Sequence, residues 1–226
     1  MTCAKAERSD GAPACGKSYS ADKITFWRVG LECRAAPQIG CGSSSRPVLS
    51  AVQKMDGVQA VWLNRSGTAI AVVWSEVPNG ERIDALRALL QKKHLSPHRT
   101  LSPQRLSGDE HRNAMASFLS GCMWYQSNEL DLLSEEEYRV ISSRLVVRLQ
   151  SRVSVASRQA KVLEQAFFET LKHKQNLTRG DGTGTAADHI LRERLLQVGR
   201  RYLDERGMEA LRQVIAQGLG PQQGER

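Results

Sequence analysis

Two cysteines separated by a short loop, Cys33 and Cys41, are the residues of this chain best suited to chemistry. Cys41 lies in the small-residue segment 39–47, at the predicted start of a helix that follows a strand. The positive end of a helix stabilises a thiolate, and thiolates bind soft metal ions or attack disulfides. The pattern therefore predicts a thiol site that either holds a metal ion or takes part in redox chemistry.

Three interpretations of this cysteine pair stay open. In the first, both sulfur atoms converge on one ion, and His94 or His98 supplies a third ligand. In the second, the pair cycles between dithiol and disulfide, with Arg46 and the helix N-terminus lowering the pKa of Cys41. In the third, the cysteines belong to the core, because cysteine is among the most buried residue types.

A run of three serines at positions 43–45 follows Cys41. The backbone N–H groups of such a loop can hold an oxyanion, and Arg46 would add positive charge. Helix capping explains the same residues more simply, with Ser45 as the N-cap and Pro47 in the first helical turn. We therefore expect the serines to begin the helix.

Length and composition exclude several classes of protein. The 226 residues are 40% hydrophobic, enough for a core, and they include five cysteines, an odd and irregularly spaced set that does not match a disulfide framework. No apolar run approaches the roughly 20 residues that span a bilayer, and the N-terminus lacks the apolar stretch of a signal peptide. We expect a cytoplasmic protein with reduced thiols and no membrane span.

The net charge of +8 raises the question of an anionic partner such as nucleic acid. The arginines of the first half are scattered, and they are not interleaved with aromatic residues as in proteins that grip single strands. Nucleic acid is therefore not the favoured partner. The sequence also contains no nucleophile elbow, zinc-hydrolase helix or dinucleotide fingerprint, so it does not predict an enzyme.

The pattern of apolar residues predicts two regions of different class after a disordered leader at residues 1–22. In residues 23–103, strand-like and helix-like patterns alternate in the order βαββαβ. The expected strands are 24–29, 58–63, 68–74 and an edge strand within 95–101, and the expected helices are 47–55 and 81–93. This order predicts an α+β, ferredoxin-like domain with two helices on one face of an antiparallel sheet.

The segment 39–74 resembles the heavy-metal-associated domain of copper chaperones and metal-pumping ATPases. The signature of that family is a Met-x-Cys-x-x-Cys loop, a helix, and a Gly-Val pair that opens the second strand. Here Gly57-Val58 occupies the place of that pair, and Cys41 takes the first ligand position. The sequence departs from the signature at Ser44, which stands where the family has its second cysteine, and at Gln38-Ile39-Gly40, which replaces the usual Gly-Met.

The resemblance extends over about residues 23–103 and implies binding of Cu(I) or another soft metal ion and its transfer to a partner protein. Cys41 would be the principal thiolate. Cys33 lies eight residues upstream, at the end of the first predicted strand, and could replace the missing second cysteine if the loop between them folds back. A single cysteine would not suffice, because the family holds the ion between two thiolates.

Residues 104–226 have helical periodicity with almost no strand pattern, and we recognise no family resemblance in them. The expected helices are 107–126, 134–153, 155–174, 187–201 and 205–217. The sequence therefore predicts that an all-α helical domain follows the ferredoxin-like domain. We expect this second domain to form a homo-oligomer or to bind a partner.

Two further patterns in the helical half have structural explanations. Arg144, Arg148 and Arg152 recur every four residues, and a solvated helix face is the favoured interpretation of this basic stripe. The segment 122–124, Cys-Met-Trp, could extend a soft-metal path, but core packing explains it more simply.

The sequence as a whole predicts a protein that binds or hands over a soft heavy-metal cation through Cys41 and Cys33. Two alternatives from other classes remain. A thiol redox module would use the same cysteines, whereas a non-catalytic scaffold for protein or nucleic acid would not depend on them.

Overall fold

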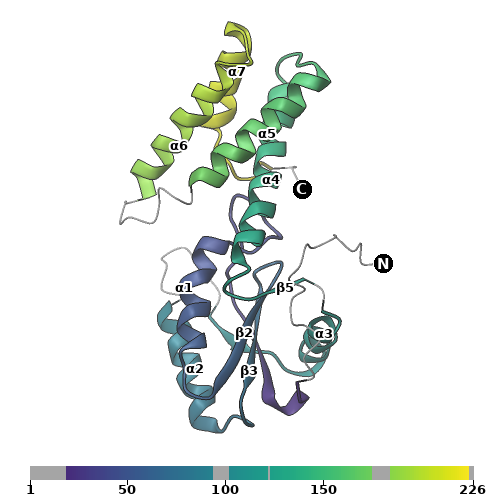
Figure 1. Cartoon of the computed structure of the whole chain (residues 1–226), viewed down its shortest axis with the longest axis vertical. Coiled ribbons are helices and arrows are strands. Elements are labelled where there is room, and N and C mark those ends of the chain that lie inside the picture. Colours follow the sequence, from purple (N-terminus) through teal and green to yellow (C-terminus); the bar gives the residue numbers. More distant parts are fainter. Residues whose placement is uncertain (1–18, 94–101, 122, 175–183, 224–226) are drawn as a thin grey trace. The chain divides into compact units, whose positions relative to one another are not determined.

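The structure is a computed structural model that describes residues 19–93, 102–121, 123–174 and 184–223 (Figure 1). It has an α+β architecture, and its chain divides into two compact units. The first, here called the sheet unit, contains the chain up to Cys33 and Gln38–Leu133. The second, the helical unit, contains Arg34–Pro37 and the chain from Ser134 onward. The loop between Cys33 and Gln38 therefore belongs to a different unit from the residues that flank it.

A five-stranded antiparallel sheet in the order β4-β1-β3-β2-β5 forms the centre of the sheet unit. All six residues of the middle strand, β3, are buried, as expected for an apolar run covered on both faces. The strands are β1 (Ile24–Arg28), β2 (Val58–Asn64), β3 (Ala69–Trp74), β4 (Gln104–Arg105) and β5 (Trp124–Tyr125).

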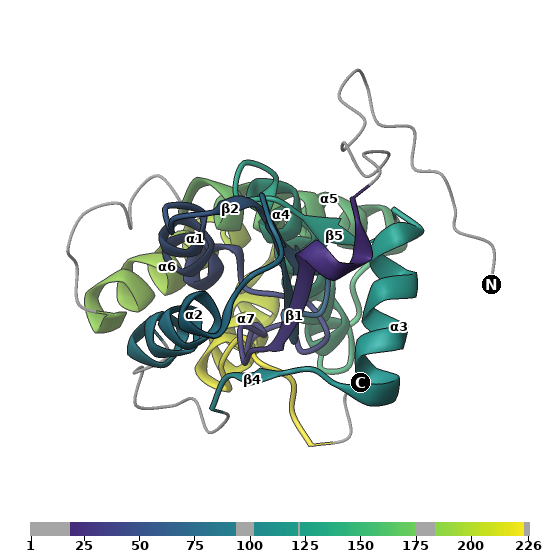
Figure 2. The same cartoon turned by 90° about the horizontal axis from the view of Figure 1, so that it is seen from below.

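Helices cover both faces of this sheet. Helices α1 (Gly42–Gln53) and α2 (Gly80–Lys93) lie on one face, and α3 (Gly108–Leu119) lies on the other (Figures 1 and 2). Side chains of a strand alternate between faces, so Phe26 of β1 enters the cluster under α3, where its ring lies 5.9 Å from that of Phe118. The neighbouring Trp27 points the other way, toward Arg87 of α2.

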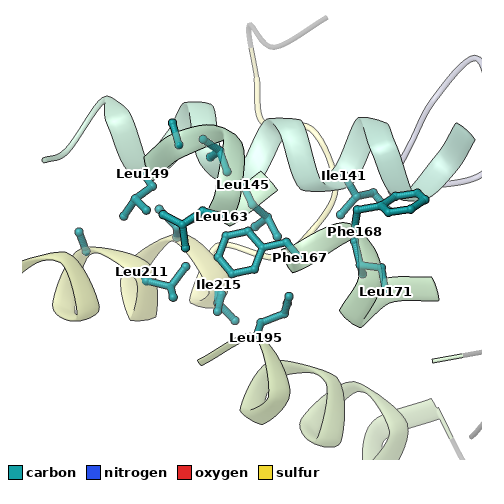
Figure 3. Close-up of a cluster of buried hydrophobic side chains, with 14 of the residues drawn as sticks. Ile141, Leu145, Leu149, Leu163, Phe167, Phe168, Leu171, Leu195, Leu211 and Ile215 are labelled. Atoms are coloured by element: carbon teal, nitrogen blue, oxygen red, sulfur yellow. The ribbon is translucent and has the colours of Figure 1, made fainter. Parts of the chain in front are cut away.

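The helical unit is formed by α4 (Leu130–Gln150) from Ser134 onward, α5 (Ser157–Lys174), α6 (Gly184–Gly199) and α7 (Glu205–Ala216). Figure 3 shows side chains from all four helices meeting in one apolar cluster, with Phe167 of α5 among them. Asp204 precedes helix α7, and its Oδ1 accepts a hydrogen bond of 2.8 Å from Gly207 N. This is a side-chain N-cap, and it satisfies one of the free donors of the first turn.

The basic stripe on α4 is not a solvated face. Arg148 is only 5% exposed, and its guanidinium donates to Gly218 O at 2.7 Å and to Gly220 O at 2.6 Å. Arg144 is half-buried, whereas Arg152 is exposed. The interpretation as a solvated stripe is therefore wrong for the first two arginines, because backbone carbonyls of the C-terminal segment replace water around them.

Most of the strands and helices expected in residues 23–93 are confirmed within one or two residues, but α1 begins earlier than expected. Cys41 is its N-cap, so Ser45 does not cap the helix and Pro47 lies inside it, beyond the first turn. The cause lies in the preceding loop. Cys41 N donates to Leu31 O at 2.7 Å, which fixes the backbone at Cys41 and lets the helix start at the next residue.

The two edge strands of the described sheet, β4 and β5, were not among the predicted strands. The expected edge strand at 95–101 lies outside the described residues, and Gln104–Arg105 pairs with β1. Trp124–Tyr125 pairs with β2 inside a region expected to be helical, because two-residue strands carry no periodic signal. With α3 packed under the sheet, the unit extends to Leu133 instead of ending at residue 103.

Among the helices of the described residues, none has both the length and the apolar character that a membrane crossing requires.

Candidate thiol site

The two cysteines lie on a short two-stranded ribbon that follows β1. Cys33 N donates to Ile39 O at 2.8 Å, and Cys41 N donates to Leu31 O at 2.7 Å. Between these bonds, Glu32 and Gly40 form an antiparallel bridge. Cys33 therefore lies opposite Ile39. Ile39 and Cys41 are two residues apart on one strand and share a face, so Cys33 and Cys41 occupy diagonal positions on the same face of the ribbon.

The turn between β2 and β3 holds the ribbon in place. Leu31 N donates to Gly67 O at 2.8 Å, and Gly40 N donates to Arg65 O at 2.7 Å. Gly67 has φ +76°, and a Cβ at this position would lie 2.6 Å from the Gly40 Cα and 2.7 Å from Leu31 O. Only glycine allows this close approach of two backbones. The position of the ribbon is thus fixed by backbone contacts on both of its strands.

These contacts bring the two thiols together. The Sγ atoms of Cys33 and Cys41 lie within 4.8 Å of each other. Cys33 is buried, with 6% of its surface exposed, and Cys41 is partly exposed. The pair therefore offers one shielded sulfur and one that a partner molecule can reach.

Cys41 is also the N-cap of α1. Its carbonyl oxygen accepts a hydrogen bond of 2.9 Å from Ser45 N, the first bond of the helix. Its Sγ lies 3.2 Å from Ser43 Oγ. The expected location of a thiol at a helix N-terminus is thereby confirmed, and the positive end of the helix favours the ionised sulfur.

Hydrogen-bond donors lower the pKa of Cys41 from its ordinary value of 9.0 to about 5. The largest cause is the Cys33 thiol, which donates to the Cys41 sulfur; burial acts in the opposite direction, and the hydroxyls of Ser43 and Ser44 add further donors, together with the backbone N–H of Ser44. Cys41 is therefore a thiolate at neutral pH.

Arg46 does not have the role that the sequence suggested for it. Its Nη2 donates to Asp131 Oδ1 at 2.6 Å, and the leading causes of the low pKa of Cys41 are the thiol and serine donors. The hydroxyls of Ser43 and Ser44 and the backbone N–H of Ser44 donate to the Cys41 sulfur, so these donors are not available to a separate oxyanion. A Cys-x-x-Ser spacing at a predicted helix start is the signal that could have identified Ser44 as a donor.

Bond lengths limit what the cysteine pair can do. A metal–thiolate bond is about 2.3 Å long, so one ion can join two sulfurs that are as much as about 4.6 Å apart. A disulfide needs sulfurs about 2.05 Å apart and Cα atoms usually about 4.4–6.8 Å apart. Diagonal positions on antiparallel strands lie about 7–8 Å apart. The ribbon geometry therefore suits an ion between the sulfurs better than a direct bond between them.

The other predicted ligands and cysteines are not part of this description. The residues concerned, all outside the described part of the chain, are Cys3, Cys15, His94, His98 and Cys122. Comparison of the chain with family models, with curated proteins and with solved structures finds no match.

Proposed function

We propose that this protein binds a soft heavy-metal cation, Cu(I) or one of similar chemistry, between the thiolates of Cys33 and Cys41. The observation that carries the proposal is the position of the two sulfurs, within 4.8 Å of each other on one face of the ribbon. Thiolate sulfur is the ligand that soft monovalent ions prefer, and two such ligands neutralise and hold one ion.

The arrangement of the surrounding elements supports the proposal. Elements β1 to β4 follow the order βαββαβ, and the neighbours β4-β1-β3-β2 form one antiparallel sheet, as in a ferredoxin-like domain. In the heavy-metal-associated family that residues 39–74 resemble, the metal loop joins the first strand to the first helix. Cys41 occupies the corresponding loop here. A common fold is weak evidence for function by itself, so the proposal depends on the sulfur geometry.

The chemistry of binding follows from the two different thiols. Cys41 is already ionised at neutral pH, and the Cys33 thiol donates its proton in a hydrogen bond to the Cys41 sulfur. On binding, Cys33 and Cys41 would hold the ion in place of that proton, and the proton would leave to solvent. The partly exposed Cys41 lets a thiolate of a partner protein attack the ion, so handover would proceed by ligand exchange at this sulfur.

The test is an anaerobic titration of the reduced protein with Cu(I) against a competing chelator. The wild-type chain is compared with Cys33→Ala and Cys41→Ala, all in a background where Cys3, Cys15 and Cys122 are replaced by serine. We expect one equivalent to bind, with the affinity reduced more than about 100-fold in either alanine variant, since removing a ligand exceeds the loss typical of an outer contact. Equal affinity in all three proteins would exclude the site.

A redox-responsive thiol is the second candidate, favoured by the low pKa of Cys41. The Cys41 thiolate would attack a small disulfide, releasing one thiolate and forming a mixed disulfide. The Cys33 thiol, after losing its proton, would displace the second small thiolate and close the Cys33–Cys41 bond. Loss of two thiols together on mild oxidation, and only one in Cys33→Ala, would support this candidate. This candidate ranks second because the diagonal placement of the cysteines does not suit a direct bond between their sulfurs.

A further inference from the structure

The loop between the two cysteines is held by a residue far away in the sequence. Arg144, on α4, donates through Nη1 to Ala35 O in the loop and to Leu219 O in the C-terminal segment, the latter at 3.1 Å. Both of these contacts lie within the helical unit, because Arg34–Pro37 belongs to that unit. One guanidinium nitrogen thus binds the loop and the C-terminal segment at the same time.

Packing supports the same connection. Ala35 and Leu219 are partly buried, and both pack against the apolar cluster of the helical unit. Gly220 comes so close to the loop that a Cβ on it would lie 3.3 Å from Arg34 O. Arg148 donates hydrogen bonds to Gly218 O and Gly220 O of the same C-terminal segment. The loop is therefore in contact with a C-terminal segment, Gly218–Gly220, that is itself hydrogen-bonded to α4.

From these contacts we infer that Arg144 is the positioning residue of the thiol pair, which anchors the tip of the Cys33–Cys41 loop between α4 and the C-terminal segment. This inference deepens the proposed metal site and rests on it. A loop that is free in solution has to be ordered when its two ends bind an ion, and that ordering weakens binding. An anchor on the loop tip removes this cost before the ion arrives.

The test compares two arginine substitutions in the same unit. Arg144→Gln removes the anchor, and Arg152→Gln is the matched control, since exposed Arg152 donates to Gln213 Oε1 and not to the loop. Two readouts are taken: Cu(I) affinity against a competing chelator, and amide hydrogen exchange of residues 34–40 in the metal-free protein. Tryptophan fluorescence and far-UV circular dichroism confirm that each variant is folded.

We expect Arg144→Gln to weaken Cu(I) binding about 10-fold, as for other contacts that orient metal ligands, and to speed exchange in the loop. Its sulfur-to-metal absorption band should also change, and Arg144→Lys should restore part of the affinity. Arg152→Gln should match the wild type in every readout. A folded Arg144→Gln protein with wild-type affinity and wild-type loop exchange would overturn the inference.

Two further outcomes keep the test decisive. If Arg144→Gln does not fold, a chain ending at Gln217, which lacks the C-terminal segment, replaces it with the same expected results. If the wild-type protein binds no Cu(I), the proposed function fails, but loop exchange still decides whether Arg144 anchors the loop. Unchanged exchange in the truncated chain would contradict the anchor.

Discussion

The two units of this protein stabilise polar groups in opposite ways. In the sheet unit, donors from Cys33, Ser43 and Ser44 converge on a sulfur that remains partly exposed and changes its protonation state. In the helical unit, Arg148 is buried and bound to backbone carbonyls. A partly exposed group that can gain or lose a proton can react with other molecules, whereas a permanently charged group bound to the backbone stabilises the fold.

The ionisation of Cys41 tests this contrast with the largest expected effect. The rate at which iodoacetamide alkylates Cys41 in the metal-free protein should follow a midpoint near pH 5, instead of the ordinary 9.0, because hydrogen-bond donors stabilise the thiolate. Mass analysis of the Cys41 peptide separates this reaction from that of the other cysteines. In Cys33→Ala the midpoint should rise, since the largest donor is lost. A wild-type midpoint near 9 would contradict the described site.

The same ionisation makes stability depend on pH. The pKa of Cys41 is lower in the folded protein than in the unfolded chain, so its ionised form stabilises the fold fully above about pH 9. This contribution is lost as the pH falls toward about 5. The free energy of unfolding of the metal-free wild type should therefore decrease from pH 9 to pH 5 more than that of Cys41→Ala. Parallel pH profiles would contradict this linkage.

The next prediction asks whether the two cores unfold separately. Phe118→Ala in the sheet unit and Phe167→Ala in the helical unit each remove a buried ring and should cost about 3–5 kcal/mol of stability. All tryptophans belong to the sheet unit, so their fluorescence reports that unit alone: Trp27, Trp62, Trp74 and Trp124.

In urea titrations, Phe118→Ala should shift the fluorescence transition, whereas Phe167→Ala should shift mainly the circular dichroism signal of the helices. The two substitutions act as controls for each other, because each removes the same side chain from a different core. If either substitution moves both transitions equally, the two units unfold together and the contrast between them does not extend to stability.

The buried arginine gives a smaller effect. Arg148→Met leaves the carbonyls of Gly218 and Gly220 without the donors described above, and should cost about 1.5–3 kcal/mol, the usual range for hydrogen bonds to charged groups. Arg152→Met, at an exposed position, should change stability by no more than about 0.5 kcal/mol. Urea unfolding followed by circular dichroism measures both. Equal effects of the two substitutions would mean that the buried Arg148 contributes no more to the free energy of unfolding than the exposed Arg152.

The smallest effect concerns one hydroxyl. Ser44→Ala removes a side-chain donor to the Cys41 sulfur but keeps the backbone N–H of residue 44, which also donates to it. One hydrogen bond of about 1 kcal/mol should raise the pKa of Cys41 by less than about one pH unit. Ser50→Ala, on the same helix but bonded to Ser127, should leave the alkylation profile unchanged. A profile for Ser44→Ala identical to the wild type would remove Ser44 from the site.

Much of the sheet unit could be predicted from the sequence, because its central strands and first two helices have the periodicity of their secondary structure. The edge strands β4 and β5 could not, since two residues form no pattern. Cys33 and Cys41 were recognised as a pair, but their proximity depends on the glycine contact between Gly40 and Gly67, which no local pattern reveals.

In the helical unit, the sequence predicted the helices but not the surroundings of their arginine side chains. Its helices follow from periodicity, but the spacing of Arg144 and Arg148 indicated a solvated face, whereas both bind carbonyls of a segment about 70 residues later. A four-residue repeat defines which face of a helix a residue shares, and it carries no information on what covers that face. Long-range contacts made by an irregular segment therefore decided between a solvated and a buried arginine.

X-ray absorption at the copper edge tests the central claim most directly, because it counts the atoms bound to the ion. The sample is the Cu(I)-loaded protein in which Cys3, Cys15 and Cys122 are replaced by serine, so that Cys33 and Cys41 are its only cysteines. The account predicts two sulfur neighbours at a single distance. One sulfur, or a shell of nitrogen and oxygen atoms, would contradict an ion held between the two thiolates.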